Sequence, residues 1–288
     1  MRNADLRKVE DSDAFINPKS EIRIPKSKNP KSEMTRRRFY APPRSFSNEG
    51  SVVLSAEESR HLRDVLRLRA GDEVSVFDGE GREFACAVRE AGGRGGDAVL
   101  EVRGTAEPPR PESPLSLTLA VALLKGEKFD LVVQKATELG VTRVVPVLSA
   151  RADVRPRVAR DTERRVERWR RLALEASKQS GRARVPLVDS PQTFERLVAD
   201  ESASPNAARI LFSERGGVGL DSLSDELTMR PASVVALVGP EGGWDDEELA
   251  LGRTHAWMLV TLGGRTLRAE TAAVTVCALL QNLFGDLK

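Results

Sequence analysis

Two glycine-rich turns follow apolar runs in the second half of the chain, and each leads into a segment that starts a helix. The first lies in LVGPEGGWDDEEL, residues 237–249, and the second in TLGGRTLRAETAA, residues 261–273. Glycine has no side chain, so the backbone at such a turn approaches a bound molecule closely. These two turns are therefore the first candidates for a ligand site.

The residues after the first turn disfavour a phosphate ligand. The amino terminus of a helix attracts anions, yet Asp245, Asp246, Glu247 and Glu248 already supply negative charge there. The chain also lacks the G-x-x-x-x-G-K-[ST] phosphate-loop sequence. A neutral or cationic ligand fits better, and S-adenosylmethionine, which carries a sulfonium, is such a ligand. The purely structural alternative is a turn in which Asp245 caps the helix and Glu248 completes a capping box.

Length and composition indicate a globular protein with room for two domains, since 40% of its 288 residues are hydrophobic and 31% are charged. No apolar run reaches the length of a membrane span and no secretory signal is recognisable, so we expect a cytoplasmic protein with no membrane segment. Cys86 and Cys277 lie far apart, and His61 and His255 are the only histidines. The sequence therefore predicts neither a disulfide framework nor a metal site.

The formal net charge of +2 hides two basic clusters. Residues 1–38 contain 11 Lys and Arg against 6 Asp and Glu, and residues 151–171 contain 9 Arg against 4 Asp and Glu. Clustered arginine suits the phosphate backbone of a nucleic acid, while a solvated surface is the alternative. We therefore expect RNA contacts from these clusters only if other features support them.

The first half of the chain divides into an extension and a small β domain. Residues 1–36 are polar, rich in lysine and proline, and without periodicity, which predicts a disordered basic extension. Within residues 37–106, Ser55 and Glu58 have the spacing of a capping box before a short helix with Leu62, Val65 and Leu66 on its apolar face. Short alternating runs separated by glycine turns then predict a small antiparallel barrel or sandwich.

A proline-rich linker over residues 104–114 precedes a second domain, residues 115–288, with an α/β rhythm. Strand, helix and strand patterns within residues 115–148 predict a βαβ unit, whose strands must run parallel. An open parallel sheet binds its ligand beyond the carboxyl ends of its strands, where both glycine-rich turns lie. The final helix, about residues 270–284, is apolar on nearly every face, which predicts burial or a homodimer interface.

Six segments together resemble the RsmE family of 16S ribosomal RNA uridine N3-methyltransferases, within the SPOUT superfamily. They are RRFYAPP, HLRDVLRLRAGDEVSVFDGEG, KGEKFDLVVQKATELGV, EASKQSGR, LVGPEGG and LGGRTLRAETA, in order from about Arg37 to the C-terminus. The resemblance implies a PUA-like RNA-binding domain, an α/β domain with a C-terminal trefoil knot that binds S-adenosylmethionine, and a homodimer acting on the small ribosomal subunit. The first 36 residues have no counterpart in the family pattern.

The resemblance also implies which positions form the sites. Arg268 would be the catalytic residue. Contacts to RNA would come from Arg37, Arg38, Arg151 and Arg182, although a helix-packing role for Arg182 is an equal alternative. The methyl donor would lie among residues of three loops: Glu214, Leu237, Gly239, Glu241, Gly242, Gly243, Leu262, Gly263 and Leu267.

The chemistry of uridine N3 limits the role of the basic residue in the second turn. Arg268 stays protonated and cannot act as a base, but it can hold a phosphate or the negative charge on a uracil oxygen. Glu270 is a candidate proton acceptor, although its place at a helix start favours an interaction with the helix terminus. Two alternatives remain open. One is a SPOUT ribose 2′-O-methyltransferase acting on tRNA or another rRNA site, and the other is an RNA-binding protein without activity.

Overall fold

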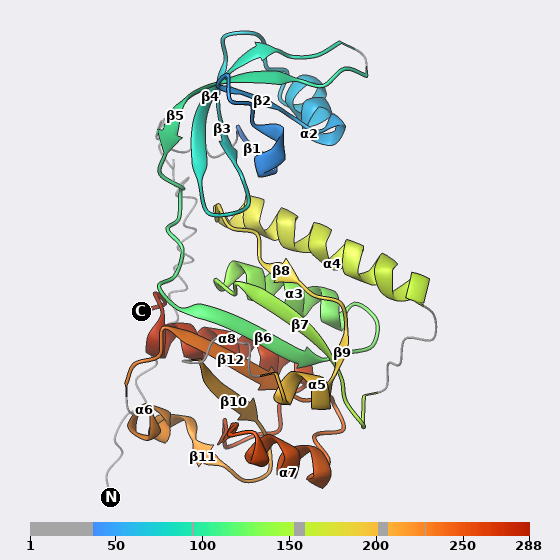
Figure 1. The fold of residues 1–288 in the computed structure, drawn as a ribbon, viewed down its shortest axis with the longest axis vertical. Coiled ribbons are helices and arrows are strands. Elements are labelled where there is room, and N and C mark those ends of the chain that lie inside the picture. Colours follow the sequence, from blue (N-terminus) through green and yellow to red (C-terminus); the bar gives the residue numbers. More distant parts are fainter. Residues whose placement is uncertain (1–36, 94, 153–158, 201–206, 228) are drawn as a thin grey trace, which may run out of the picture.

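The computed structural model describes residues 37–93, 95–152, 159–200, 207–227 and 229–288. The expected extension over residues 1–36 and part of the basic cluster at 151–171 lie outside these ranges. The described residues form two bodies, each built on its own β-sheet (Figure 1). Strand β5, Val99–Ala106, leads from the first body into the second, so the predicted linker begins within a strand.

The first body contains a five-stranded sheet in the order β1-β3-β4-β5-β2. Three of its strand pairs, β3 with β4, β4 with β5 and β2 with β5, are antiparallel as predicted, whereas β1 and β3 are parallel. Because a second strand and a helix separate β1 from β3 in the sequence, no tight hairpin forces these two to run antiparallel. The other strands of this sheet are β1 Arg38–Tyr40, β2 Ser51–Val53, β3 Glu73–Phe77 and β4 Glu83–Glu90, and a 3-10 helix, η1 (Pro43–Ser45), lies between β1 and β2.

A short helix, α2 (Ala56–Arg60), covers this sheet and continues into a π-helical turn, η2 (His61–Val65). Half of the predicted capping box is present, since Ser55 Oγ accepts a hydrogen bond of 3.3 Å from the Glu58 amide, whereas the Glu58 carboxylate accepts from Lys178 at 2.8 Å instead of from the Ser55 amide. The predicted apolar face is correct at Leu62, which is fully buried, and wrong at Val65, which is 65% exposed. The π turn holds more residues than an α turn, so Val65, its last residue, is rotated away from the face that α-helical spacing predicts.

The second body contains an eight-stranded sheet in the order β11-β13-β10-β12-β6-β7-β8, with β9 also paired to β7. Every neighbouring pair described in it is parallel, which confirms the βαβ prediction. Its strands are β6 Ser116–Ala122, β7 Arg143–Leu148, β8 Leu187–Val188, β9 Gln192–Thr193, β10 Ala208–Phe212, β11 Val218–Gly219, β12 Ser233–Val238 and β13 Met258–Thr261.

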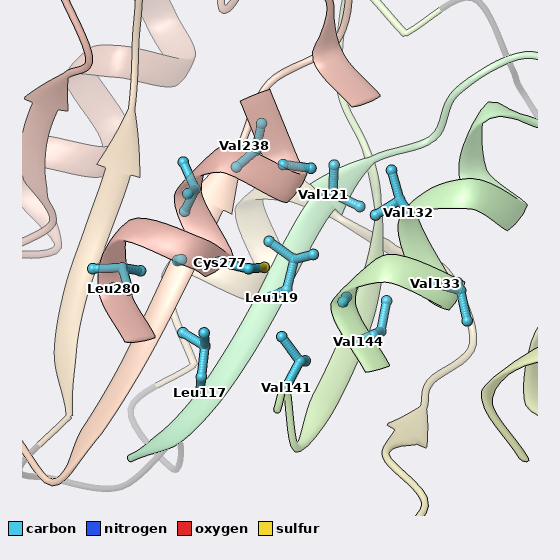
Figure 2. Packing of buried hydrophobic residues seen from close by; sticks show 14 of the residues in the cluster. Leu117, Leu119, Val121, Val132, Val133, Val141, Val144, Val238, Cys277 and Leu280 are labelled. Carbon is cyan, nitrogen blue, oxygen red and sulfur yellow. The ribbon is translucent and has the colours of Figure 1, made fainter. Parts of the chain in front are cut away.

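Helices cover both faces of this sheet. Successive strand side chains point to opposite faces. Leu117, Leu119 and Val121 of β6 therefore join the core with residues of α3 and α8 (Figure 2). Ala120 joins a second core on the other face. The helices are α3 Lys128–Glu138, α4 Ala159–Ser180, α5 Phe194–Val198, η3 Leu220–Ser222, α6 Leu223–Glu226, α7 Asp246–Thr254 and α8 Ala269–Phe284. None of the described helices is long and apolar enough to cross a membrane.

The last helix, α8, is largely buried, as its composition predicts. The five apolar positions that the sequence suggested are at most 5% exposed and pack on the sheet and on α3, whereas Val274 and Leu279 keep partial exposure. The five are Ala273, Val276, Cys277, Leu280 and Phe284.

Candidate active site

Three loops at the carboxyl ends of neighbouring strands surround one cavity. They follow β10, β12 and β13, which lie side by side in the parallel sheet. The cavity has a volume of about 360 Å³. The sheet order therefore brings the two glycine-rich turns together with a third loop, at the edge where a parallel sheet binds ligands. The lining residues are Phe212, Ser213, Glu214, Val238, Gly239, Pro240, Glu241, Gly242, Gly243, Thr261, Leu262, Gly263, Gly264, Arg265, Thr266, Leu267, Ala269 and Ala272.

Trp244 connects the first two of these loops. Its indole is buried, and Nε1 donates a hydrogen bond of 2.8 Å to the carbonyl oxygen of Phe212 at the end of β10. The ring lies against Gly239, where an added Cβ would be 2.9 Å from Trp244 Cε2. A side chain at Gly239 would therefore displace either the indole or the turn that lines the cavity.

Gly243 closes the turn after β12 and requires the absence of a side chain for two reasons. Its φ of +68° lies in the left-handed region, and an added Cβ would collide with the carboxylate of Glu214 from the neighbouring loop. The Gly243 amide donates a hydrogen bond of 3.0 Å to the Pro240 carbonyl oxygen, which fixes the turn. The sequence GPEGG is therefore a tight turn with an acidic neighbour.

The third loop, after β13, presents its backbone to the cavity in the same way. Gly263 and Gly264 have φ of +67° and +69°, and the Gly263 amide donates to Thr261 Oγ1 at 3.2 Å. Leu262 and Leu267 line the cavity beside these glycines. The loop thus offers both backbone polar groups and apolar side chains to a ligand.

The amino terminus of α7 is already occupied by its own carboxylates. Asp245 accepts from the Glu248 amide at 2.9 Å and Glu248 Oε2 accepts from the Asp245 amide at 3.1 Å, so the predicted capping box is confirmed. Glu248 also accepts from the Ala150 amide at 2.9 Å, which links the loop after β7 to this terminus. A phosphate at this terminus would meet negative charge rather than free amides.

Eight of the nine residues expected to contact a methyl donor line the cavity, and Leu237 is the exception. Its side chain is fully buried in the core on the opposite face of the sheet, beneath α5 and α7. Residues alternate across β12, so Val238 rather than Leu237 faces the cavity. The eight are Glu214, Glu241, Gly239, Gly242, Gly243, Leu262, Gly263 and Leu267.

Arg268 lies immediately before α8, between the lining residues Leu267 and Ala269, and does not itself line the cavity. It occupies the N-cap position, but its side chain makes no capping hydrogen bond. The side chain is exposed, and within the described ranges no hydrogen bond or ion pair engages it. The guanidinium is therefore available to a ligand rather than held by the fold.

Two of the four arginines expected to bind RNA are buried instead. Arg38 is 5% exposed, its Nη2 lies 2.9 Å from Glu83 Oε2, and it also donates to the Arg182 carbonyl oxygen at 2.8 Å. Arg182 is 4% exposed and forms an ion pair of 2.7 Å with Glu112. Each guanidinium is held by a carboxylate and by carbonyl oxygens, and Arg38 reaches the second body through the Ser177 and Arg182 carbonyl oxygens, so the structure presents neither side chain to RNA.

The other two arginines have exposed side chains. The side chain of Arg37 is 42% exposed and its Nη1 lies 3.7 Å from Asp72. Arg151 is exposed beside the glycine-rich turn, where its Nη1 donates to the Gly242 carbonyl oxygen at 3.4 Å. Of the four, only Arg151 lies next to the cavity.

A second and larger cavity, of about 540 Å³, lies at the amino ends of the strands. It is lined by polar residues that include Ser116, Thr142, Arg143 and Arg184, and it contains none of the expected donor residues. Volume alone therefore does not identify the site, whereas the glycine-rich loops and the strand ends do.

Sequence reasoning missed several residues of the site. Phe212 and Val238 line the cavity at the ends of their strands, and Trp244 donates a hydrogen bond to the Phe212 carbonyl oxygen. Lys128, at the start of α3, contacts Glu241 of the glycine-rich turn. A signal was available for Trp244, which directly follows GPEGG, but a lysine more than a hundred residues away gives no local sign of this contact.

The fold and the site define a class of protein, an α/β enzyme domain that binds a small ligand among strand-end loops and carries a separate small β domain. The family model described as an RNA methyltransferase domain matches residues 111–281. The model described as an RNA methyltransferase PUA domain matches residues 54–101. The PUA match falls on the first body of the structure, and the methyltransferase match falls on the second.

Individual relatives agree with this class. Ribosomal RNA small subunit methyltransferase E of Synechocystis sp. is 34% identical over 235 residues, covering 82% of this chain and 74% of the relative. The protein of the same name from Mycobacterium bovis is 33% identical over 241 residues, covering 82% and 87%. The structure of the Neisseria gonorrhoeae protein of that name, bound to S-adenosylmethionine, is 31% identical with a TM-score of 0.76, covering 87% of this chain and 99% of that one. The chain belongs to the ribosomal RNA small subunit methyltransferase E family.

Proposed function

We propose that this protein methylates the N3 atom of a specific uridine in 16S ribosomal RNA, with S-adenosylmethionine as methyl donor. The observation that carries the proposal is the cavity formed by the loops after β10, β12 and β13 in a chain of this family. The Neisseria relative was solved with S-adenosylmethionine bound, which supports the same ligand here.

The cavity suits this donor chemically. Gly239 and Gly243 leave room where a Cβ would collide with neighbouring groups, so the turn keeps its backbone next to the ligand. Leu262 and Leu267 supply apolar surface for an adenine ring, and the carboxylate of Glu214 favours a cationic ligand over a phosphate. When bound, S-adenosylmethionine supplies a methyl group attached to an electrophilic sulfonium.

Arg268 is the residue proposed to act on the base. Uridine N3 carries a weakly acidic proton, and its loss places negative charge on the flanking carbonyl oxygens. A guanidinium beside the cavity stabilises that charge without exchanging a proton itself. The exposed and unengaged side chain of Arg268 supports this role. Alignment of N3 with the donor methyl supplies a further part of the rate.

RNA binding is assigned to the first body and to the rim of the cavity. In this proposal, residues 37–106 form a PUA-like RNA-binding domain and residues 115–288 form the methyl-transfer domain. Arg37 and Arg151 carry the proposed phosphate contacts, because their side chains are exposed. Arg151 is the closer of the two to the donor turn, through its contact with Gly242.

The proposal extends to topology, assembly and compartment. We propose that the loops after β10, β12 and β13 form a trefoil knot. We also propose that the protein is a homodimer. Val274 and Leu279 on α8 are only partly buried within one chain and are suited to a contact with a second copy. A cytoplasmic location follows from the proposed substrate, the small ribosomal subunit.

Nucleoside mass spectrometry of 16S RNA tests the reaction. We expect a deletion strain to lose 3-methyluridine and to regain it on complementation with the wild-type gene. The purified protein should also transfer label from S-adenosylmethionine to subunits from that strain. Loss of a 2′-O-methylated nucleoside in place of 3-methyluridine would support the alternative ribose reaction on rRNA, and transfer only to tRNA would support the tRNA alternative.

A further inference from the structure

An ion-pair cluster beside the donor cavity joins three elements that are distant in the sequence. Lys128 begins α3, Glu241 lies in the glycine-rich turn after β12, and Glu270 lies in the first turn of α8. Lys128 Nζ contacts Glu241 Oε1 directly and lies 3.9 Å from Glu270 Oε1. A single ammonium group therefore lies between two carboxylates at the edge of the site.

The two carboxylates differ in burial, so Lys128 has two separate effects: it compensates the charge of Glu270 and restrains the turn at Glu241. The side chain of Glu270 is 13% exposed, and its Oε2 is buried without a hydrogen-bond partner among the described residues. Without Lys128, this carboxylate would lack its nearby positive charge, a costly arrangement in a poorly solvated position. The side chain of Glu241 is 43% exposed, so its turn has more freedom to move unless a contact restrains it.

The restrained turn is the one that lines the cavity. Pro240, Glu241, Gly242 and Gly243 all line it, and the turn contains two glycines, whose backbone is the least restricted of any residue. Lys128 is the side chain from α3 that contacts this turn through Glu241.

We propose that Lys128 is a positioning residue for the methyl donor, which holds the turn at Glu241 against α3 and α8. The inference rests on the proposed function, because it takes the cavity to be the site of S-adenosylmethionine. Lys128 does not line the cavity itself, so its effect passes through Glu241. The turn is then ordered before the donor arrives, and binding costs less conformational entropy.

Calorimetry with S-adenosylmethionine tests the proposal. Lys128→Met keeps the length of the side chain and removes its charge, and we expect donor affinity to fall by roughly tenfold or more, the scale of a lost charge-assisted contact. Lys128→Arg should restore most of that affinity because it keeps the charge. Lys135→Met is the matched control, since Lys135 lies on the same helix and pairs only with Glu138 at 2.9 Å among described residues. The control should bind the donor as wild type does.

Kinetics and a double-mutant cycle separate positioning from general damage. In Lys128→Met, the KM for the donor should rise while kcat at saturating donor stays within about threefold of wild type. Adding Lys128→Met to Glu241→Gln should weaken donor binding little further, because the contact is already lost. The double variant Lys128→Met/Glu270→Gln should melt at a higher temperature than Lys128→Met alone, since the buried charge is removed.

Three results would overturn the inference. One is unchanged donor affinity in Lys128→Met. Another is that Lys128→Met lowers donor affinity as much in the Glu241→Gln background as it does in the wild-type protein. The third is failure of the wild-type protein to bind S-adenosylmethionine, which would overturn the proposed function as well. Wild-type binding with an unaffected Lys128→Met variant would overturn only the role of Lys128.

Discussion

The indole of Trp244 lies against the Cα of Gly239, close enough that an added Cβ would come within 2.9 Å of the ring. Trp244 is itself held by its hydrogen bond to the Phe212 carbonyl oxygen. This contact joins the loop after β12 to the end of β10. It requires glycine at position 239, because a side chain there would move the groups that shape the cavity.

Gly239→Ala is expected to weaken donor binding by at least about tenfold, because either the buried indole or the turn must move. Calorimetry with S-adenosylmethionine measures the effect. Gly104→Ala is the matched control, since an added Cβ at Gly104 meets nothing within 4 Å and it lies in the other body. Equal donor affinity in the two variants would show that the contact with Trp244 has no effect on the site.

Arg268→Ala is expected to lower turnover by roughly a hundredfold or more, the usual scale for removing a group that stabilises developing charge. Donor affinity and melting temperature should stay close to wild type, because the fold does not engage this side chain. Arg268→Lys should rescue only part of the turnover, since lysine keeps the charge and loses the planar fork. Arg196→Ala, an exposed arginine on α5, is the control. Turnover of Arg268→Ala within a few-fold of wild type would refute the catalytic assignment.

Arg38→Met is expected to destabilise the protein by roughly 3–5 kcal/mol, the usual cost of breaking a buried ion pair by removing one partner. The side chain of Glu83 is only 2% exposed and would be left without its opposing charge. Urea unfolding measures the change. Arg103→Met removes an exposed pair with Glu101 of 3.0 Å and should cost less than about 1 kcal/mol. Equal losses in both variants would contradict the structural role of Arg38.

Glu58→Gln is expected to stabilise the protein relative to wild type increasingly as pH rises from 4.5 to 7. Burial raises the pKa of Glu58 above its ordinary value of 4.5, although a hydrogen bond of 2.8 Å from Lys178 opposes the shift. Because the folded state favours the neutral acid, the stability that Glu58 contributes is present below pH 4.5 and is lost as pH rises through its folded pKa. Glutamine stays neutral throughout.

Melting temperatures of wild type and Glu58→Gln across this pH range measure the difference. Other titrating groups near Glu58, Glu175 and His61, are present in both proteins. Glu57→Gln, at an exposed neighbouring position, is the control for replacing a glutamate on this helix. A difference between Glu58→Gln and wild type that is constant with pH would contradict the shift.

Local features of the site could be predicted from the sequence because they depend on residues close together in the chain. The capping box of Asp245 and Glu248 and the glycines of the two turns follow from spacing within a few residues. The βαβ pattern also implies that both turns lie at the same edge of the sheet. The individual donor residues came from the family resemblance, and eight of the nine line the cavity.

Other properties depended on which elements pack together. Leu237 and Val238 are both apolar and adjacent, and only the orientation of β12 in the sheet decides which one faces the cavity. Arg38 and Arg182 resemble surface arginines in the sequence, but the tertiary structure buries them against Glu83 and Glu112, which are distant in the chain.

The sequence by itself determined the turns, the caps and the alternation of apolar residues, because backbone conformation and burial pattern are set over short distances along the chain. The tertiary structure alone decided that Lys128 contacts Glu241, more than a hundred residues away, and that the loop at Glu214 closes against Gly243. Such contacts form only after the order of strands is fixed, since residue spacing along the chain carries no information on which strand ends become neighbours.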